Sequence, residues 1–162
     1  MSSPAPFGPD VTRVDFRPAT YEDRGFAERL YLDTMRPLLS ALDAWDEPAM
    51  LEHFRRVSRV EDARIIILDG EAIGWMEWRE LADGIELSQL QIRDGFRGRG
   101  IGTRLLRDLL AEARARRKPV SLAVVRNNYL ARRLYERLGF EVAGEGGYKL
   151  FMRWSDEPAV VA

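Results

Sequence analysis

Apolar residues in the first third of the chain predict one strand followed by two helices. Residues 14–18, VDFRP, alternate apolar and polar side chains as a strand does, and Pro18 ends the pattern. Two later stretches repeat apolar residues at helical spacing, one running from Phe26 to Pro37 and one beginning after Pro48. We therefore expect the order strand, helix, helix, with the first helix ending at Pro37.

The segment 63–78, ARIIILDGEAIGWMEW, predicts two strands joined by a tight turn. Its central dipeptide, Asp69-Gly70, tolerates the positive φ angles of a two-residue hairpin. After another turn at Asp83-Gly84, residues 85–92 continue with strand-forming residues. Three consecutive strands are expected here, and the first two should form a hairpin.

The strand at 85–92 contains an irregularity. Its first two apolar residues, Ile85 and Leu87, have odd numbers, whereas its last two have even numbers. A regular strand cannot keep all four on one face, because its side chains alternate between the faces. One extra residue near Ser88 and Gln89, a β-bulge, would place them together. Alternatively, both faces are buried under helices, and the numbering then carries no signal.

Helical and strand patterns alternate over the rest of the chain. Leucines at helical spacing follow residue 102, and residues 119–125 form a strand pattern. A second helical pattern ends at Gly139, and two strands are expected near 140–145 and 148–154. The order β α α β β β α β α β β predicts an α/β fold of the α+β type, with a mixed sheet flanked by helices.

Composition and charge restrict the class of protein. A chain of 162 residues suits one domain, which we place at 11–154 between flexible ends at 1–10 and 155–162. With 25 basic and 26 acidic residues, it has no overall field to collect nucleic acid or an anionic membrane. It has no cysteine and one histidine, His53, so no metal is expected. No signal-peptide pattern and no 18-residue apolar run occur, so we expect a cytoplasmic protein without membrane partners.

Residues 93–106, RDGFRGRGIGTRLL, place glycines at alternate positions where a helix begins. The first N–H groups of a helix lack partners and carry partial positive charge, so bare backbone there can bind a phosphate. Thr103 and Ile101 stand where a Rossmann site needs glycine and a P-loop needs lysine, which excludes both. An arginine-rich turn without a ligand remains an alternative. The candidate phosphate ligands are Arg97, Gly98, Arg99, Gly100 and Gly102, with Arg104 as a further donor.

The helix within residues 126–140 has a structural explanation by itself. Tyr135 lies on its apolar stripe and is expected in the core. Asn128 suits an N-cap, and Gly139 suits the left-handed residue that ends a helix.

Together, LQIRDGFRGRGIGTRLL and NNYLARRLYERLGF strongly resemble the two signature motifs of the GNAT superfamily of N-acetyltransferases. The resemblance covers residues 14–153 in element order. Two departures occur: Asp94 replaces an expected proline, and the Asn127-Asn128 pair makes the helix cap ambiguous by one position. The matching positions are Arg97, Gly100, Gly102, Asn128, Ala131, Leu134, Tyr135, Gly139 and Phe140.

The resemblance implies a GNAT fold, in which a mixed, mostly antiparallel sheet of about seven strands is flanked by about four helices. It also implies a splay between strands four and five, which explains the bulge. Acetyl-CoA would be the co-substrate, with its pyrophosphate on the glycine turn and its pantetheine arm paired with the preceding strand. The implied cofactor contacts are Leu90, Gln91, Ile92, Arg97, Gly98, Arg99, Gly100, Ile101, Gly102, Thr103 and Asn128.

The resemblance further implies direct attack of an amine on the thioester in a ternary complex. Tyr135 would protonate the departing thiolate, and the N–H of Ile92 would polarise the carbonyl. Glu86 is preferred as general base over Glu77, although each also fits an ordinary charged strand residue.

The acceptor is left open between a small amine, a polyamine, an amino acid, an aminoglycoside and a peptide or protein N-terminus. Trp45, Trp75 and Trp78, with Asp46 and Glu47, could seat a cationic amine. The tryptophans also fit a core, and the two acids fit a helix beginning. By resemblance, a homodimer is also possible.

Two other classes of function remain. A module that binds acyl-CoA without catalysis would carry the same motifs. The arginines of 97–117 and 126–137 could instead form a nucleic-acid surface, but Asp108, Glu112 and Glu136 interrupt them. We therefore expect no nucleic-acid partner.

Overall fold

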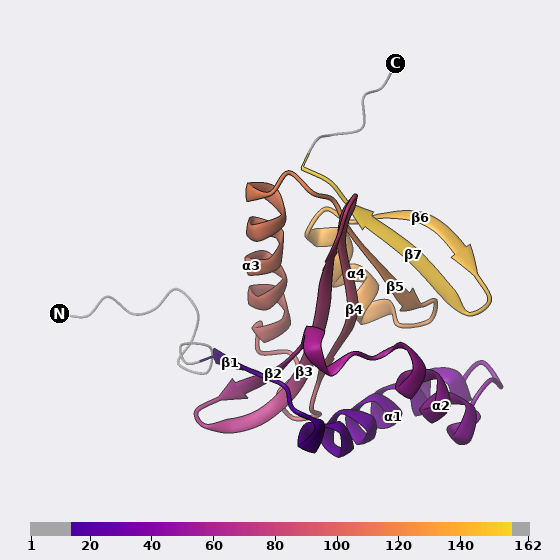
Figure 1. Ribbon diagram of the computed structural model, residues 1–162. Helices are drawn as coiled ribbons and strands as arrows, with labels where there is room; N and C mark the ends of the chain where they lie inside the picture. The colour runs from indigo at the N-terminus through magenta and orange to yellow at the C-terminus, as the bar shows by residue number, and fades with distance from the viewer. Residues whose placement is uncertain (1–13, 157–162) are drawn as a thin grey trace.

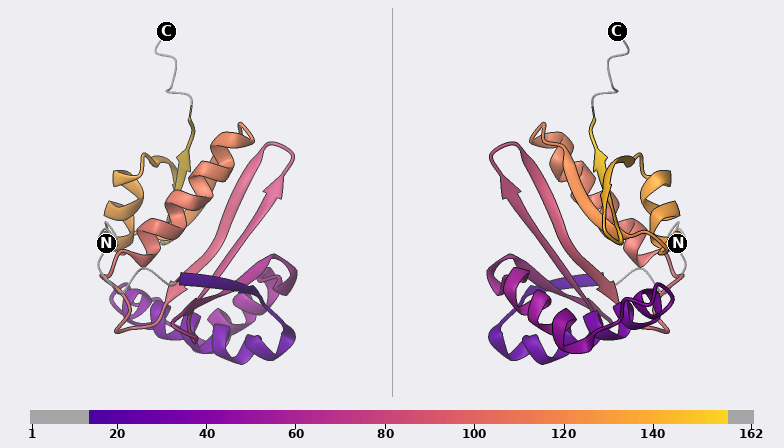
Figure 2. Two further views of the ribbon diagram at one scale, coloured as in Figure 1. Left: turned by 90° about the vertical axis from the view of Figure 1, so that its left-hand side faces the viewer. Right: turned by 90° about the vertical axis from the view of Figure 1, so that its right-hand side faces the viewer.

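The computed structural model describes residues 14–156. The predicted flexible ends at 1–10 and, apart from its first two residues, at 155–162 lie outside the described residues. One sheet runs through the molecule, with α1 and α2 covering one face and α3 and α4 the other (Figures 1 and 2).

The elements occur in the predicted order, with two short 3₁₀ turns added. Among residues 14–156, no helix is both long enough and apolar enough to cross a membrane. The helices are η2 (Tyr21–Asp23), α1 (Arg24–Ser40), α2 (Glu47–Val57), η3 (Val60–Asp62), α3 (Ile101–Ala115) and α4 (Tyr129–Arg137). The strands are β1 (Val14–Pro18), β2 (Ala63–Leu68), β3 (Glu71–Leu81), β4 (Gly84–Ile92), β5 (Val120–Val125), β6 (Glu141–Gly146) and β7 (Lys149–Trp154).

The seven strands have the order β1-β2-β3-β4-β5-β7-β6. Neighbours are antiparallel except β4 and β5, which are parallel and pair over only three residues of each strand. The predicted mixed, mostly antiparallel sheet with a splay between the fourth and fifth strands is therefore confirmed.

Local turn and cap chemistry follows the sequence at several places. Asp69 and Gly70 have φ angles of 50° and 84°, as the hairpin turn requires. Gly139 has a φ of 101° after α4, and the side chain of Asn128 accepts a hydrogen bond from Ala131 N. Asn128 is thus the cap, and the ambiguity with Asn127 is resolved.

The predicted end of the first helix at Pro37 is wrong, because α1 continues to Ser40. Proline removes one intrahelical donor, but the turn that follows supplies its own bonds. The N–H of Ala41 donates to Pro37 O, and those of Leu42 and Ala44 donate to Leu39 O. The buried side chain of Leu39 anchors this last turn.

The predicted bulge lies at Ser88. Glu77 of β3 pairs with Gln89 and Trp78 pairs with Leu87, so Ser88 is the extra residue of β4. Ile85 and Leu87 precede it in the core under α3, and the later apolar residues of β4 pack against the same core. The bulge therefore keeps one face of β4 apolar along its whole length.

The same bulge places polar side chains on the opposite face of β4. Gln89 and Gln91 are buried there, on the side of α1 and α2. A second core under these helices contains Phe54, Ile65 and Trp75. Buried amides in such a setting need hydrogen-bond partners, which makes this face a candidate site.

Gly74 of β3 has no room for a side chain. A Cβ there would lie 2.6 Å from Gln91 O and 2.9 Å from a methyl of Ile66. We expect Gly74→Ala to lower the free energy of unfolding by about 1–3 kcal/mol, because backbone and core must move. At Gly144 an added Cβ meets only Phe151 at 3.9 Å, so Gly144→Ala is the control and should change stability little. Urea titration of both variants measures this, and equal midpoints would contradict it.

Candidate active site

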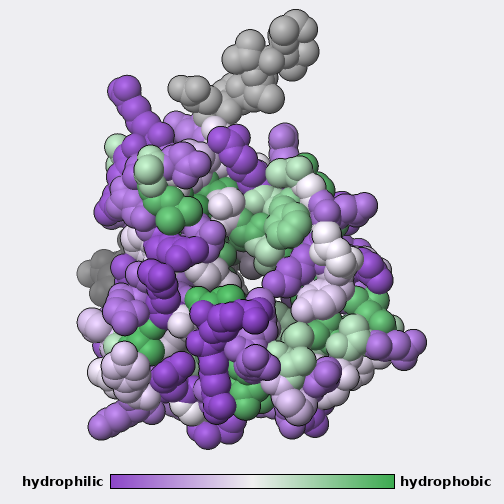
Figure 3. All heavy atoms as spheres, turned by 45° about the vertical axis from the view of Figure 1, so that its right-hand side comes forward, coloured by the Kyte–Doolittle hydropathy of each residue, from purple (hydrophilic) through white to green (hydrophobic). Residues whose placement is uncertain are grey.

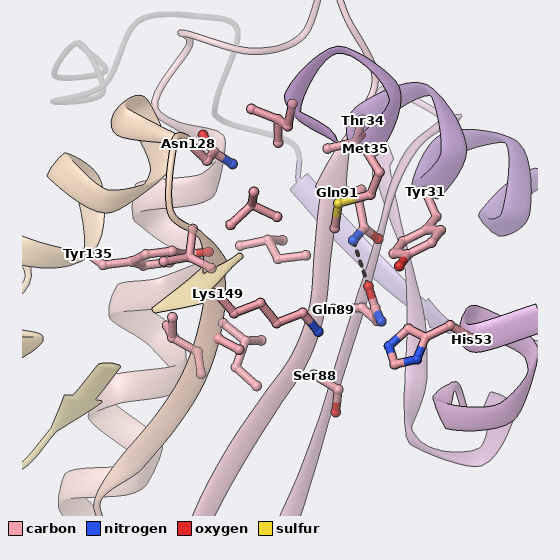
Figure 4. A pocket seen from close by; sticks show the side chains of 17 residues that line it. Tyr31, Thr34, Met35, His53, Ser88, Gln89, Gln91, Asn128, Tyr135 and Lys149 are labelled. Carbon is pink, nitrogen blue, oxygen red and sulfur yellow. Dashed lines mark hydrogen bonds between the residues drawn. The ribbon is translucent and has the colours of Figure 1, made fainter. Parts of the chain in front are cut away.

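A cleft opens where β4 and β5 part. The parallel pairing stops at Leu87 and Leu122, and the remaining residues of both strands line the cleft. Side chains of α1, α2, α4 and β7 complete it, as Figure 4 shows. The lining residues are Tyr31, Thr34, Met35, Leu38, His53, Leu87, Ser88, Gln89, Leu90, Gln91, Leu122, Ala123, Val124, Val125, Asn128, Tyr135 and Lys149.

The main chain of β4 beyond the bulge faces this cleft. Arg93 N donates to Ile73 O of β3, so polar groups of odd-numbered residues there point toward β3. Those of Leu90 and Ile92 consequently point to the side from which β5 has departed. Within the segment 90–92, the N–H and C=O of Leu90 and the N–H of Ile92 thus offer an extended edge that another extended amide chain can use, while Ile92 O accepts a hydrogen bond from Arg97 Nε.

The beginning of α3 is open to an anion. Its cap residue, Gly100, has a φ of 77° and provides no side-chain cap, whereas α2 and α4 are capped by Asp46 and Asn128. The N–H groups of Ile101, Gly102 and Thr103 precede the first intrahelical bond, which Arg104 N donates to Gly100 O.

The glycines before α3 are required by backbone conformation. Gly95, Gly98 and Gly100 all have φ between 76° and 93°, and a Cβ at any of them would meet no atom within 4 Å. This turn is therefore free of crowding, and its surface leaves space for a ligand beside the main chain. At Gly102, a Cβ would have ordinary contacts of 3.7 Å with Ile92 and Leu134.

The two arginines of the turn have protein partners. Arg97 donates from Nε to Ile92 O at 2.8 Å and from Nη2 to Thr34 Oγ1 at 3.2 Å. The guanidinium of Arg99 lies 5.2 Å from the ring centre of Phe96. Arg97 thus connects the end of β4 with α1, and Arg99 stays at the surface of the turn.

Tyr135 reaches the cleft from α4. Its ring contacts Phe140 edge-on at 5.6 Å, and its hydroxyl points toward the cleft (Figure 4). Burial raises the pKa of Tyr135 to about 12, so the phenol stays protonated through the neutral range. Tyr135 thus packs against the core, as its place on the apolar face of the helix predicts. No residue of 14–156 hydrogen-bonds to its hydroxyl, which is therefore available as a proton donor.

Asn128 and its neighbour hold the other side of the cleft. Asn128 lines it while capping α4, and Asn127 Nδ2 donates to Leu38 O of α1 at 3.0 Å. The helix α1 is therefore tied to both β4 and the start of α4.

The two carboxylates considered as bases lie outside the cleft lining. Glu86 pairs with Arg79 at 3.0 Å, on the part of β4 where β5 still pairs. Glu77 is buried and accepts hydrogen bonds from Ser58 Oγ at 2.6 Å and from Arg59 N at 3.1 Å. Burial raises the pKa of Glu77, although these hydrogen bonds oppose the shift.

The tryptophans and acids considered for the acceptor do not line the cleft either. Trp75 is buried in the core under α1, and Trp78 stacks against the guanidinium of Arg64 at 4.4 Å. Trp45 lies beneath Arg36 at 5.4 Å. Asp46 caps α2, and Glu47, the first residue of α2, pairs with Arg36. The two acids therefore serve the beginning of a helix, which was the alternative to a role in acceptor binding.

Sequence reasoning missed the residues at the α2 and β7 side of the cleft. His53 and Lys149 both point into it, next to Ser88 and Gln89 (Figure 4). Burial lowers the pKa of His53, and the charges of Lys149 and Arg56 lower it further. From the sequence, His53 was considered only as a metal ligand. The one sequence feature that singled out Lys149 is the rarity of lysine, since the chain has only two.

Tyr31 and Gln91 complete this side. Burial raises the pKa of Tyr31 to about 12, with a smaller contribution from Tyr148. Gln91 Nε2 donates to Gln89 Oε1 at 2.7 Å, while Gln91 Oε1 is buried without a hydrogen-bond partner among the described residues. A buried amide oxygen of this kind is suited to accept a hydrogen bond from a ligand.

Outside the cleft, several arginines are paired with acids. Ion pairs join Arg114 with Asp156 and Arg132 with Glu136. The surface in Figure 3 shows apolar patches among hydrophilic side chains. Within residues 14–156, no group of three or more His, Asp or Glu side chains could hold a metal ion.

Comparison with known proteins agrees with this geometry. The model of the acetyltransferase (GNAT) family matches residues 27–140. An uncharacterized N-acetyltransferase of Archaeoglobus fulgidus is 30% identical over 145 residues, covering 83% of this chain and 97% of the relative.

A further relative matches a shorter segment of this chain. The L-methionine sulfoximine/L-methionine sulfone acetyltransferase of Pseudomonas aeruginosa is 35% identical over 96 residues, or 54% of this chain. The match spans about half of that relative, 55% of its length.

Among solved structures, the PaiA N-acetyltransferase of Thermoplasma acidophilum, crystallised with coenzyme A, has the same fold. It gives a TM-score of 0.71 at 18% identity and covers 89% of this chain and 99% of its own.

Two neighbouring glycines should respond to alanine with opposite signs. Gly100→Ala places a Cβ on a left-handed residue and should cost about 1 kcal/mol of unfolding free energy. Gly102→Ala lies within α3 in ordinary contacts and should gain up to about 1 kcal/mol from helix propensity. Thermal unfolding of the two variants checks this, and stabilisation by both would show that the turn is not held as described.

Proposed function

The chain belongs to the acetyltransferase (GNAT) family, and from this premise we propose that it transfers an acetyl group from acetyl-CoA to a small primary amine. We assign the activity to residues 11–154 as a single domain. The reaction is direct, with the amine and acetyl-CoA bound together. The observation that carries the proposal is that β4, whose residues 87–91 line the cleft, leads within a short turn to the uncapped start of α3.

The residues present fit acetyl-CoA. An extended edge at Leu90, Gln91 and Ile92 suits the two amides of a pantetheine arm, and the free N–H groups at Ile101–Thr103 suit a pyrophosphate. The turn before α3, where an added Cβ at Gly95, Gly98 or Gly100 would meet no atom within 4 Å, leaves room for such an anion to approach the main chain. The residues assigned to the co-substrate are Leu90, Gln91, Ile92, Arg97, Gly98, Arg99, Gly100, Ile101, Gly102, Thr103 and Asn128.

Acetyl-CoA supplies the activated acetyl group as a thioester. The N–H of Ile92 is assigned to polarise its carbonyl, since this N–H points to the side of β4 from which β5 has departed. The Tyr135 hydroxyl is assigned as the proton source for the leaving sulfur, because burial keeps it protonated at neutral pH.

We assign the base to His53 rather than Glu86. An alkylammonium group must lose a proton before it attacks, and the base must lie within reach of it. His53 lines the cleft and its lowered pKa keeps it neutral near pH 7, whereas the carboxylate of Glu86 is paired with Arg79 outside the lining. Arg56 Nη2 lies 3.2 Å from His53 Nδ1. Because a guanidinium only donates, it occupies the lone pair of Nδ1, and this contact must open when His53 takes the proton of the amine.

A small-molecule acceptor is supported by two observations. The cleft is enclosed by side chains of four elements besides the two strands, and the Pseudomonas aeruginosa relative is named for acetylating L-methionine sulfoximine and L-methionine sulfone. Arg114, Arg116 and Arg132, which belong to the two arginine-rich stretches, have acidic partners, and these ion pairs weigh against the nucleic-acid alternative.

Release of free CoA from acetyl-CoA, measured with a panel of amines and a thiol reagent, tests the proposal. We expect release that depends on an amine, and about 10²-fold slower turnover for Tyr135→Phe with an unchanged KM for acetyl-CoA. Tyr129→Phe, on the exposed side of α4, is the matched control and should behave as wild type. Binding of acetyl-CoA without release by any amine would instead favour a non-catalytic acyl-CoA-binding module.

The pH profile tests His53. Protonation of this imidazole removes the base, so kcat/KM should fall as pH decreases through a pKa below 6.5. In His53→Gln this acidic limb should disappear and the neutral-pH rate should fall about 10²-fold. Glu86→Gln provides the comparison, and an acidic limb lost there but kept in His53→Gln would return the base to Glu86.

A further inference from the structure

The cleft carries a cation that has no anion beside it within residues 14–156. Lys149 begins β7, where it pairs with Val125 of β5, and its side chain extends into the cleft toward β4 (Figure 4). Among residues 14–156 its ammonium has no hydrogen bond or ion pair, and its one ring contact is with Tyr148 at 6.0 Å. The other lysine, Lys118, bonds both Glu80 and Leu81 O. Lys149 is therefore a half-buried cation whose N–H donors are available to a ligand.

Burial of Lys149 is unfavourable in this arrangement. Desolvation lowers the pKa of its ammonium, and the positive charge also lowers the pKa of His53 nearby. An anion bound at Lys149 would relieve both effects, because opposite charges in a partly desolvated site attract strongly.

Among the described residues, no acidic side chain lines the cleft. Its ionisable side chains are Tyr31, His53, Tyr135 and Lys149, although the whole chain has 26 acidic residues. An acceptor with several ammonium groups, such as a polyamine or an aminoglycoside, would bring more positive charge toward Lys149, and none of the described lining residues is a carboxylate that could receive it. A peptide N-terminus has an amide, which is uncharged, next to its amine.

Gln91, in contrast, offers a hydrogen-bond acceptor that needs a donor. Its buried Oε1 has no partner among the described residues, and the bond from its Nε2 to Gln89 fixes the orientation of the amide. An amine N–H can donate to this oxygen. The cleft thus offers an acceptor for an amine on β4 and a cation for an anion on β7.

We propose that the acceptor is a free amino acid, with its carboxylate bound by Lys149 and its amine at Gln91 Oε1. This inference rests on the acetyltransferase function proposed above and names its substrate class. Lys149 acts in binding and selection of the acceptor, and takes no part in proton transfer.

Matched pairs of amines test the proposal. Leucine, methionine and phenylalanine are each compared with the amine that lacks only the carboxylate, namely 3-methylbutylamine, 3-(methylsulfanyl)propylamine and 2-phenylethylamine, and with the corresponding carboxamides. Rates are compared at equal concentrations of unprotonated amine. We expect kcat/KM at least tenfold higher for the best amino acid than for its two analogues. β-Alanine and 4-aminobutyrate then measure how far apart the two groups can lie.

Substitution of Lys149 identifies the residue responsible. Lys149→Met should raise the KM for the amino acid at least tenfold, leave the KM for acetyl-CoA unchanged and abolish the preference over the decarboxylated amine. Lys149→Arg should restore part of the preference, and Lys118→Met should behave as wild type. Because methionine removes an unpaired half-buried charge, the variant should fold, and its melting temperature checks this.

The outcomes separate the two proposals. Equal use of the decarboxylated amines by the wild type, or an unchanged preference in Lys149→Met, would overturn the amino-acid assignment while acetyl transfer stands. An absence of CoA release with every compound would overturn the acetyltransferase function and this inference with it.

Discussion

One extra residue in β4 controls the architecture of the site. Ser88 lets β4 keep its ladder with β3 while changing which of its main-chain groups point toward β5. Before the bulge, Ile85 N donates to Pro119 O on that side, and after it the strands separate. The same residue keeps the apolar side chains of β4 under α3 and turns two glutamines toward α1 and α2. The bulge at Ser88 thus accounts for three features together: the separation of β4 from β5, the polar side chains of β4 in the cleft, and its unbroken apolar face under α3.

The charges of the molecule are divided between its surface and its cleft. Several arginines at the surface form ion pairs with acids, and such exposed pairs contribute little to stability, about 0–1 kcal/mol each. In the cleft, no carboxylate from the part of the chain that the structure describes offsets Lys149. This contrast gives the cleft a local positive potential in a chain whose net charge is -1, so that ligand selection does not depend on the overall field.

Much of the fold followed from local rules in the sequence. The hairpin at Asp69-Gly70 and the α4 cap are set by residues next to one another, and the bulge showed as a change in the numbering of apolar residues. The end of α1 was misjudged because Leu39, which anchors the turn after Pro37, is buried by a distant core. A rule about one proline cannot include that contact.

The site was only half visible for the same reason. The glycine turn and Tyr135 lie in motifs with fixed spacing, so their residues could be named from the sequence. His53 and Lys149 are 96 positions apart, and no periodicity links α2 with β7. Their meeting depends on tertiary packing across the cleft. Polar strand residues such as Glu86 were therefore considered instead, although the ladder directs that side chain to Arg79.

The connections of α1 have a consequence for how such a protein can diversify. Arg97 and Asn127 attach this helix to the two sides of the cleft through Thr34 and Leu38 O, and α1 follows β1 at the edge of the sheet. The helical insert between β1 and β2 is thus a replaceable cover, separate in sequence from the glycine turn. Exchange of this insert can remodel one wall of the cavity during evolution while the strand edge and helix start beneath it are inherited intact.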